Sequence, residues 1–262
     1  MVLSSSTPRL ACGRESLLLV PLGLLLLLGL EAVRHDGASE MNMKTSKVET
    51  GKVFPTHSSN YTEESQRIAD ALQLAPGMSY GEVGGGAGTF FRLMSSYVMP
   101  GGQVFGTGAS PAEVNAMLSA VAGIEGLASS AVVAGELTSG LPTKCCDVIL
   151  LRMVYHMLAE PRAYLQDFKR ALKPGGKLLL LEHDAGNGMT GREGAVLDVV
   201  MPNGMSMSMG VVPPAALLTE VVSAGFTVVT DHFPKGIIEP WPYFNDPGHG
   251  IDERGYALLL TA

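Results

Sequence analysis

Apolar residues follow two spacings that alternate along most of the chain. Short apolar runs bounded by turn residues are typical of buried strands. Such runs occupy residues 78–83, 103–106, 131–134, 147–153 and 177–182. Between them, apolar positions three and four apart predict helices that begin near residues 62, 89, 111, 161 and 213. Two more extended stretches come last, at residues 226–231 and 256–260.

This alternation predicts an α/β fold. Five strand-and-helix units favour a doubly wound parallel sheet, and the two late stretches extend it to a mostly parallel sheet of seven strands over residues 61–262. Ser110 and Glu113 form a capping box with Pro111 at the first helical position, which marks one helix start. Lys-Pro-Gly-Gly at 173–176 ends another helix.

The N-terminal segment follows neither spacing. Residues 17–30 are an uninterrupted apolar run, with Arg9 and Arg14 before it. A membrane-spanning helix needs about 20 apolar residues, whereas the core of a signal peptide needs roughly 7–15. The run therefore predicts a signal peptide or a short signal anchor.

Three segments follow from this pattern: a targeting segment at 1–32, a polar linker at 33–60 and one domain at 61–262. The expected location is the secretory pathway or one of its membranes, with membrane association through residues 17–30. The segment is either cleaved off or kept as an anchor, and the sequence is compatible with both.

Composition narrows the classes of function. The chain has 18 Lys and Arg against 25 Asp and Glu, a net charge of −7, so nothing predicts nucleic acid as a partner. Three cysteines, Cys12, Cys145 and Cys146, cannot form a disulfide framework. We expect the neighbours Cys145 and Cys146 to be packing residues that are too awkwardly placed to pair. No Cys-x-x-Cys or His-Glu-x-x-His motif predicts a metal site.

A glycine loop follows the first predicted strand, which ends near Glu82. Gly84, Gly86 and Gly88 alternate with other residues at the point where a ligand can approach the backbone. The dinucleotide fingerprint would place its last glycine where this chain has Thr89, and the Gly-Lys-Ser/Thr ending of a phosphate loop is absent. The loop is a tight turn or a binding site, and its place in the sheet favours the second.

Several motifs in order carry a family resemblance. They lie at residues 82–88, 102–106, 146–150, 155–158 and 164–177. Together they resemble class I S-adenosylmethionine-dependent methyltransferases, in the type 11-like branch that acts on small molecules. The resemblance implies a Rossmann-like sheet with an antiparallel last strand, and S-adenosylmethionine as the cofactor.

The resemblance implies cofactor contacts around the glycine loop. Gly84, Gly86 and Gly88 would line the methionine part of the cofactor, and Glu82 would lie near its ammonium group. Arg152 would lie near the cofactor at the end of the fourth strand. The alternative for Glu82 is a strand-end carboxylate bonded to backbone donors, and Arg152 is equally an ordinary salt-bridge partner.

At the second strand the chain departs from the family. An acidic residue usually holds the ribose hydroxyls there, and Gly108 takes its place in this chain. Thr107 or Ser110 would compensate in part, and Gly108→Asp is expected to tighten cofactor binding. Glu136 would contact the adenine amino group, or else be a solvated loop carboxylate.

Two histidines are candidates for proton transfer. His156 follows the fourth strand, and the ordinary pKa of histidine is near physiological pH. His183, with Asp184, follows the fifth strand and is the second candidate. His156 has structural packing as its alternative role.

Methionines indicate the kind of acceptor. Met201, Met205, Met207 and Met209 crowd one predicted loop, where they would cover an apolar substrate or fill gaps in the core. An aromatic insert at 240–247 would flank the opening of the substrate site or seal the edge of the sheet. The predicted function is methyl transfer to a small apolar acceptor. The alternative is a methyltransferase-like binding or scaffold protein in which Gly108 has weakened catalysis.

Overall fold

The computed structural model describes residues 61–184, 196–200, 206–230, 239–242 and 254–262. The predicted targeting segment, 1–32, and the linker, 33–60, lie outside this part of the chain. Within the described residues no helix is both long and apolar enough to cross a membrane.

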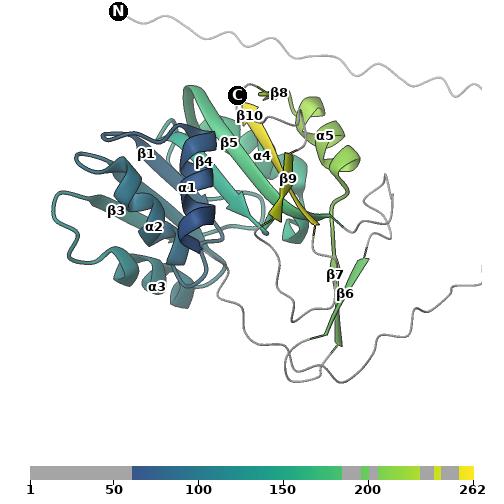
Figure 1. Ribbon diagram of the computed structural model, residues 1–262, viewed down its shortest axis with the longest axis horizontal. Coiled ribbons are helices and arrows are strands. Elements are labelled where there is room, and N and C mark those ends of the chain that lie inside the picture. Colours follow the sequence, from purple (N-terminus) through teal and green to yellow (C-terminus); the bar gives the residue numbers. More distant parts are fainter. Residues whose placement is uncertain (1–60, 185–195, 201–205, 231–238, 243–253) are drawn as a thin grey trace, which may run out of the picture. The chain divides into compact units, whose positions relative to one another are not determined.

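Helices and strands alternate as the apolar spacing predicted (Figure 1). The α-helices are α1 Tyr61–Leu72, α2 Thr89–Val98, α3 Pro111–Val121, α4 Pro161–Ala171 and α5 Pro214–Ser223. A single-turn helix, η1, spans Tyr155–Met157. The first five strands are β1 Ser79–Val83, β2 Gln103–Gly108, β3 Ala128–Val133, β4 Cys146–Arg152 and β5 Leu172–Asp184. The later strands are β6 Val196–Val200, β7 Ser206–Gly210, β8 Thr227–Val228, β9 Glu239–Trp241 and β10 Arg254–Thr261.

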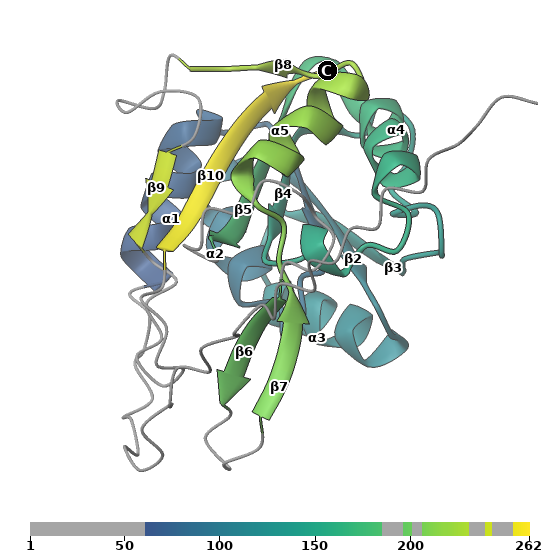
Figure 2. The same ribbon diagram turned by 90° about the vertical axis from the view of Figure 1, so that its right-hand side faces the viewer.

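The main sheet has the order β3-β2-β1-β4-β5-β10-β8, with β9 also paired to β10. Strands β1 to β5 are parallel, and β10 is antiparallel to β5. The sheet has eight strands rather than the predicted seven, because β9, which was not predicted, pairs with β10 beside the expected β8 (Figure 2). The first residues of the aromatic insert, Pro240 and Trp241, therefore cover the edge of the sheet at β10.

Two apolar cores lie on opposite faces of the sheet. One joins α1, α2 and α3 to the sheet, with Phe91 and Met94 fully buried. The other joins α4 and α5 to it, with Phe168 and Leu217 fully buried. The central strands are buried on both faces, as continuous apolar runs require. The parallel strands therefore end at one shared edge, where ligands of such folds collect.

Two local predictions need correction. The strand expected to be buried at 131–134 is β3, which begins at Ala128 and is largely exposed, because residues 134–145 form no helix to cover this edge. The predicted methionine loop, 201–209, overlaps strand β7, which pairs with the preceding β6 in an antiparallel ribbon. Met201 and Met205 lie outside the described residues.

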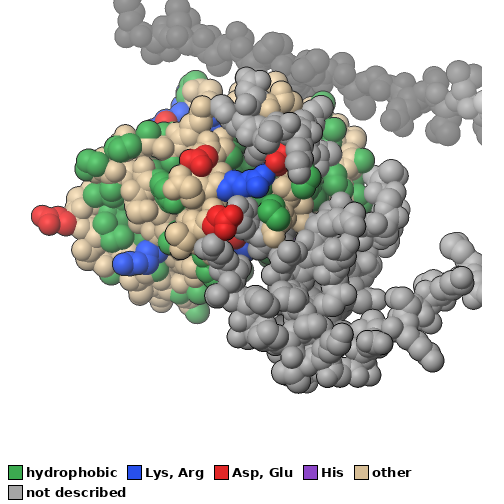
Figure 3. Space-filling model, viewed as in Figure 1, with side chains coloured by type: hydrophobic (Ala, Val, Ile, Leu, Met, Phe, Trp, Pro, Cys, Tyr) green, Lys and Arg blue, Asp and Glu red, His purple; other side chains and the backbone are tan. Residues whose placement is uncertain are grey.

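Few charged side chains appear on the face of the domain in Figure 3, and Lys and Arg form no extended patch there. Apolar and uncharged polar surface separates them. The pattern agrees with the low share of charged residues in the chain, 16%.

Candidate active site

The loop between β1 and α2 turns by means of three left-handed glycines. Gly84, Gly86 and Gly88 have φ of 72°, 50° and 81°, a backbone region that side chains disfavour. A Cβ on Gly84 would lie 2.5 Å from Val154 Cγ2, and one on Gly88 would lie 2.8 Å from Met117 Cα. A Cβ on Gly86 would meet no atom within 4 Å. Gly86 therefore faces open space.

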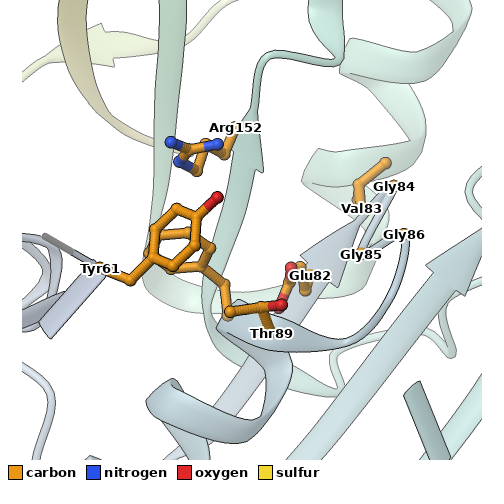
Figure 4. A pocket seen from close by; sticks show the side chains of 9 residues that line it. Tyr61, Glu82, Val83, Gly84, Gly85, Gly86, Thr89 and Arg152 are labelled. Carbon is orange, nitrogen blue, oxygen red and sulfur yellow. The ribbon is translucent and has the colours of Figure 1, made fainter. Parts of the chain in front are cut away.

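That space is a pocket at the carboxyl edge of the sheet (Figure 4). Its lining residues come from the start of α1, the β1–α2 loop, the first turn of α2 and the end of β4. They are Tyr61, Glu82, Val83, Gly84, Gly85, Gly86, Thr89, Phe90 and Arg152. In Figure 4, Tyr61 and Arg152 lie on one side of Glu82 and the glycines on the other.

Four residues predicted from the sequence thus meet in one pocket: Glu82, Gly84, Gly86 and Arg152. Gly88 borders an adjacent hollow instead, together with Thr62 and Arg92.

Glu82 places a buried carboxyl group in this pocket. Glu82 is the last but one residue of β1. It is 5% exposed, and its side chain accepts a hydrogen bond from the Tyr80 hydroxyl at 3.1 Å. Burial raises the pKa of Glu82 to about 8, against the lowering effects of the Tyr80 hydrogen bond and the Arg152 charge. At neutral pH the group is therefore largely protonated, and a bound cation would favour its ionised form.

Arg152 joins the end of β4 to α1. Its Nε and a terminal nitrogen donate to the two carboxylate oxygens of Glu64 at 2.8 and 3.0 Å, a fork-like geometry that is among the strongest polar contacts. Trp241 Nε1 also donates to Glu64, at 3.0 Å. The guanidinium lies 4.7 Å from the centre of the Phe90 ring. Arg152 is thus both a salt-bridge partner and part of the pocket wall.

The carboxylate of Glu113, in the first turn of α3, lies near the end of β2. The sequence analysis did not assign it a role in the site. A Cβ on Gly108 would lie 2.8 Å from Glu113 Cβ. The Glu113 carboxylate accepts the backbone N–H of Ala109 at 2.9 Å. Ser110 caps α3 by accepting the backbone N–H of Glu113 at 3.3 Å. The side chain of Glu113 therefore lies against the position that a Cβ at residue 108 would take.

Three predicted cofactor contacts do not line the pocket among the described residues: Gly108, Ser110 and Glu136. Gly108 ends β2 and Ser110 follows it, so both lie at the edge of the sheet where the pocket opens. Glu136 is exposed in the turn that follows β3.

His156 is held by a buried carboxylate. Its Nδ1 lies 2.8 Å from Glu182 Oε2, and the backbone N–H of Tyr155 donates to Glu182 Oε1 at 2.6 Å. The side chain of His156 is 7% exposed and that of Glu182 is 1% exposed. In the described part of the chain, Nε2 of His156 has no hydrogen-bond partner. Glu182 thus fixes the orientation of the His156 imidazole through Nδ1, and Nε2 is available for another hydrogen bond.

His183 lies apart from that pair. Adjacent residues of a strand face opposite sides of a sheet, so His183 and Glu182, neighbours in β5, point to different faces. His183 is 9% exposed and has a partner of its own. The side chain of Asp184 lies outside the described atoms. Among the described residues, no group of three or more His, Cys, Asp or Glu side chains could hold a metal ion.

Sequence reasoning missed Glu64, Glu113 and Glu182. Glu64 and Glu182 are single charged residues without a distinctive spacing, and each meets its partner through the fold. Glu113 carried one local signal, its place in the capping box, which indicates a helix start and not a binding role.

The comparison with protein families identifies the family of this chain. A family described as a methyltransferase domain matches residues 59–231 of the chain. An uncharacterised protein in a transposon of Streptomyces fradiae is 32% identical over 118 residues, which are 45% of this chain and 33% of that protein. The chain thus spans about a third of the length of this curated relative.

Solved structures show the same fold at low identity. An S-adenosylmethionine-dependent methyltransferase from Aquifex aeolicus has a TM-score of 0.55 at 18% identity, covering 76% of this chain and 89% of its own. A 4+2 cyclase has a TM-score of 0.59 at 17% identity, covering 81% and 85%. A methyltransferase from Mesorhizobium loti has a TM-score of 0.54 at 14% identity, covering 77% and 98%.

Proposed function

The chain belongs to the class I S-adenosylmethionine-dependent methyltransferases, whose cofactor is S-adenosylmethionine, and we propose that it transfers the cofactor's methyl group to a small apolar acceptor. The observation that carries this proposal is the pocket between Glu82 and the open side of Gly86. One of the neighbours in fold is a cyclase, so the fold by itself does not decide the reaction.

The residues of the pocket fit the cofactor. Gly86 leaves room where any Cβ would project, so a ligand can approach the backbone. Glu82 offers a buried carboxyl whose ionised form complements the ammonium of the cofactor's methionine part. Bound there, S-adenosylmethionine supplies an electrophilic methyl group on a sulfonium.

We assign the ribose contact to Glu113 in place of Gly108. Its carboxylate lies at the end of β2 and is fixed by the Ala109 N–H. In this proposal, Glu113 supplies from α3 the acidic contact that Gly108 lacks. This assignment supports turnover and weakens the argument for a scaffold protein, which depended on Gly108.

Methyl transfer requires that the acceptor is correctly oriented and that one proton is removed from it. The protein must hold the acceptor in line with the methyl carbon, which lowers the barrier without strong acid or base groups. His156 would accept a proton at Nε2 from an acceptor hydroxyl, with Nδ1 held by Glu182. The four methionines between 201 and 209 support an apolar acceptor.

We further propose that residues 1–32 direct the chain to the secretory pathway or anchor it at a membrane. The proposal rests on the apolar run at 17–30. A fluorescent reporter fused to residues 1–50 tests it, and a uniformly cytosolic signal would contradict it.

Calorimetry on the full chain with S-adenosylmethionine tests the cofactor proposal. Because Glu82 has a pKa of about 8 and the ammonium favours its carboxylate form, affinity should rise about tenfold from pH 6 to pH 7. Glu82→Gln has no such carboxylate and should bind weakly with a flat pH profile. No binding at any pH, or the same slope in both proteins, would contradict the assignment. A screen with labelled methyl groups against lipid, quinone and phenolic extracts then identifies the acceptor.

The correction at position 108 gives a second prediction. Gly108→Asp should weaken S-adenosylmethionine binding, because its Cβ crowds Glu113 Cβ at 2.8 Å and its charge repels the Glu113 carboxylate. Glu113→Gln should lower affinity about tenfold, the effect of one charged hydrogen bond. Glu125→Gln, an exposed residue at the opposite edge of the sheet, is the matched control and should bind as wild type. Tighter binding by Gly108→Asp would contradict the assignment of the ribose contact to Glu113.

A further inference from the structure

Two thiols meet where β4 begins, at the edge of the sheet opposite the pocket. The Sγ atoms of Cys145 and Cys146 lie 2.7 Å apart. We expected from the sequence that these neighbours would be too awkwardly placed to pair, and the structure brings them together. Because the methyl-transfer pocket is built at the carboxyl ends of the strands, this pair does not belong to it.

The local backbone explains how adjacent residues can meet. In a regular strand their side chains would point to opposite faces. Here Lys144, just before the pair, has a φ of 52°, and the register between β4 and β5 shifts between Cys146 and Val148. Such irregularities re-aim side chains and often mark functional positions. The contact is therefore a product of the backbone at this strand end.

The two thiols differ in surroundings. Cys146 is fully buried, whereas Cys145 is partly exposed. The hydrogen bond from Cys146 lowers the pKa of Cys145, and the charges of Arg170 and Lys173 lower it further. The same hydrogen bond and burial raise the pKa of Cys146. A reactive, accessible thiol thus lies against a protected one.

We propose that Cys145 and Cys146 form a redox-active pair that a small-molecule disulfide converts into a vicinal disulfide. The Cys145 thiolate attacks one sulfur of the small disulfide, which forms a mixed disulfide and releases one thiolate. Cys146 then gives up its proton and attacks the Cys145 sulfur, which releases the second thiolate. In sum, two protein thiols are oxidised to one disulfide, and one small disulfide is reduced to two thiols.

Mass spectrometry of the full chain tests this pair, with oxidised glutathione as the probe. Trypsin cleaves after Lys144 and Arg152, so both cysteines fall in the single peptide 145–152. After oxidation that peptide should be lighter by two hydrogen atoms, and a reductant should restore its mass. A peptide that keeps two free thiols, or that is joined to the peptide containing Cys12, would overturn the proposal.

Two variants test the order of attack. In Cys146→Ala the mixed disulfide should accumulate on Cys145, because no second thiol resolves it. In Cys145→Ser the buried Cys146 should stay unmodified under the same conditions. Equal glutathione adducts on both variants would contradict the assigned roles. Far-ultraviolet circular dichroism of each variant confirms that the fold is retained, and the readout does not depend on methyl transfer.

Discussion

Replacing Gly86 by Val should abolish S-adenosylmethionine binding and leave the domain folded. The Cβ has open space around it in the protein alone, so the structure can accept the side chain sterically. That space belongs to the pocket between Glu82 and Arg152, and the added methyl groups would fill it. We expect affinity in calorimetry to fall by more than about a hundredfold, equivalent to roughly 3 kcal/mol or more of binding free energy.

A second glycine provides the matched control. Gly77, in the turn between α1 and β1, has a φ of 85° and also has open space around its Cβ position. Gly86→Val and Gly77→Val therefore carry a similar backbone cost of about 1–2 kcal/mol. Both should melt at similar temperatures, and only Gly86→Val should lose the cofactor. Normal binding by Gly86→Val would mean that the loop is only a turn.

Replacing His156 by Asn should lower the turnover number about 10²- to 10³-fold at unchanged cofactor affinity. Asn retains an N–H donor for the Glu182 carboxylate, so the buried contact at 2.8 Å can persist. It cannot accept a proton, which is the role assigned to Nε2, and a positioned base of this kind contributes about 10²–10⁴ in rate. Steady-state kinetics on the acceptor found in the labelling screen, with calorimetry for the cofactor, separates the two quantities.

Glu182→Gln tests the positioning role of the carboxylate. The amide oxygen can still accept the Tyr155 N–H, so the fold should remain, while the imidazole loses its charged partner. We expect a smaller loss of turnover, about tenfold. His183→Asn should leave turnover unchanged, because His183 points to the other face of the sheet. Unchanged turnover in His156→Asn, with loss in His183→Asn, would transfer the role to the second histidine.

Elements whose signals are local were predicted well from the chain. Helix α2 occupies Thr89–Val98 as expected, and α3 begins at Pro111 behind its Ser110 cap. Strand β4 lies within one residue of its predicted bounds at both ends. These features depend on side chains a few positions apart, so periodicity, capping and turn chemistry suffice to define them.

Features that depend on segments distant in the sequence were predicted less well. Strand β3 is exposed because residues 134–145 supply no covering helix, which its own apolar residues do not reveal. Strand β9 exists only because β10 offers its outer edge for pairing. A short segment adopts strand geometry when a partner is present, and the partner is distant in sequence.

For the candidate site, the sequence by itself determined the glycine loop, Glu82 and the family to which the chain belongs. Left-handed glycines and a strand-end carboxylate leave a recognisable local pattern. Only the tertiary structure decided that Arg152 pairs with Glu64 and that Glu182 holds His156. These partners are separated by 26 residues or more, whereas Glu113 contacts Ala109 within the helix start that the capping box predicts. No spacing rule links such residues, because their contacts exist only once the sheet has brought its strand ends to one edge.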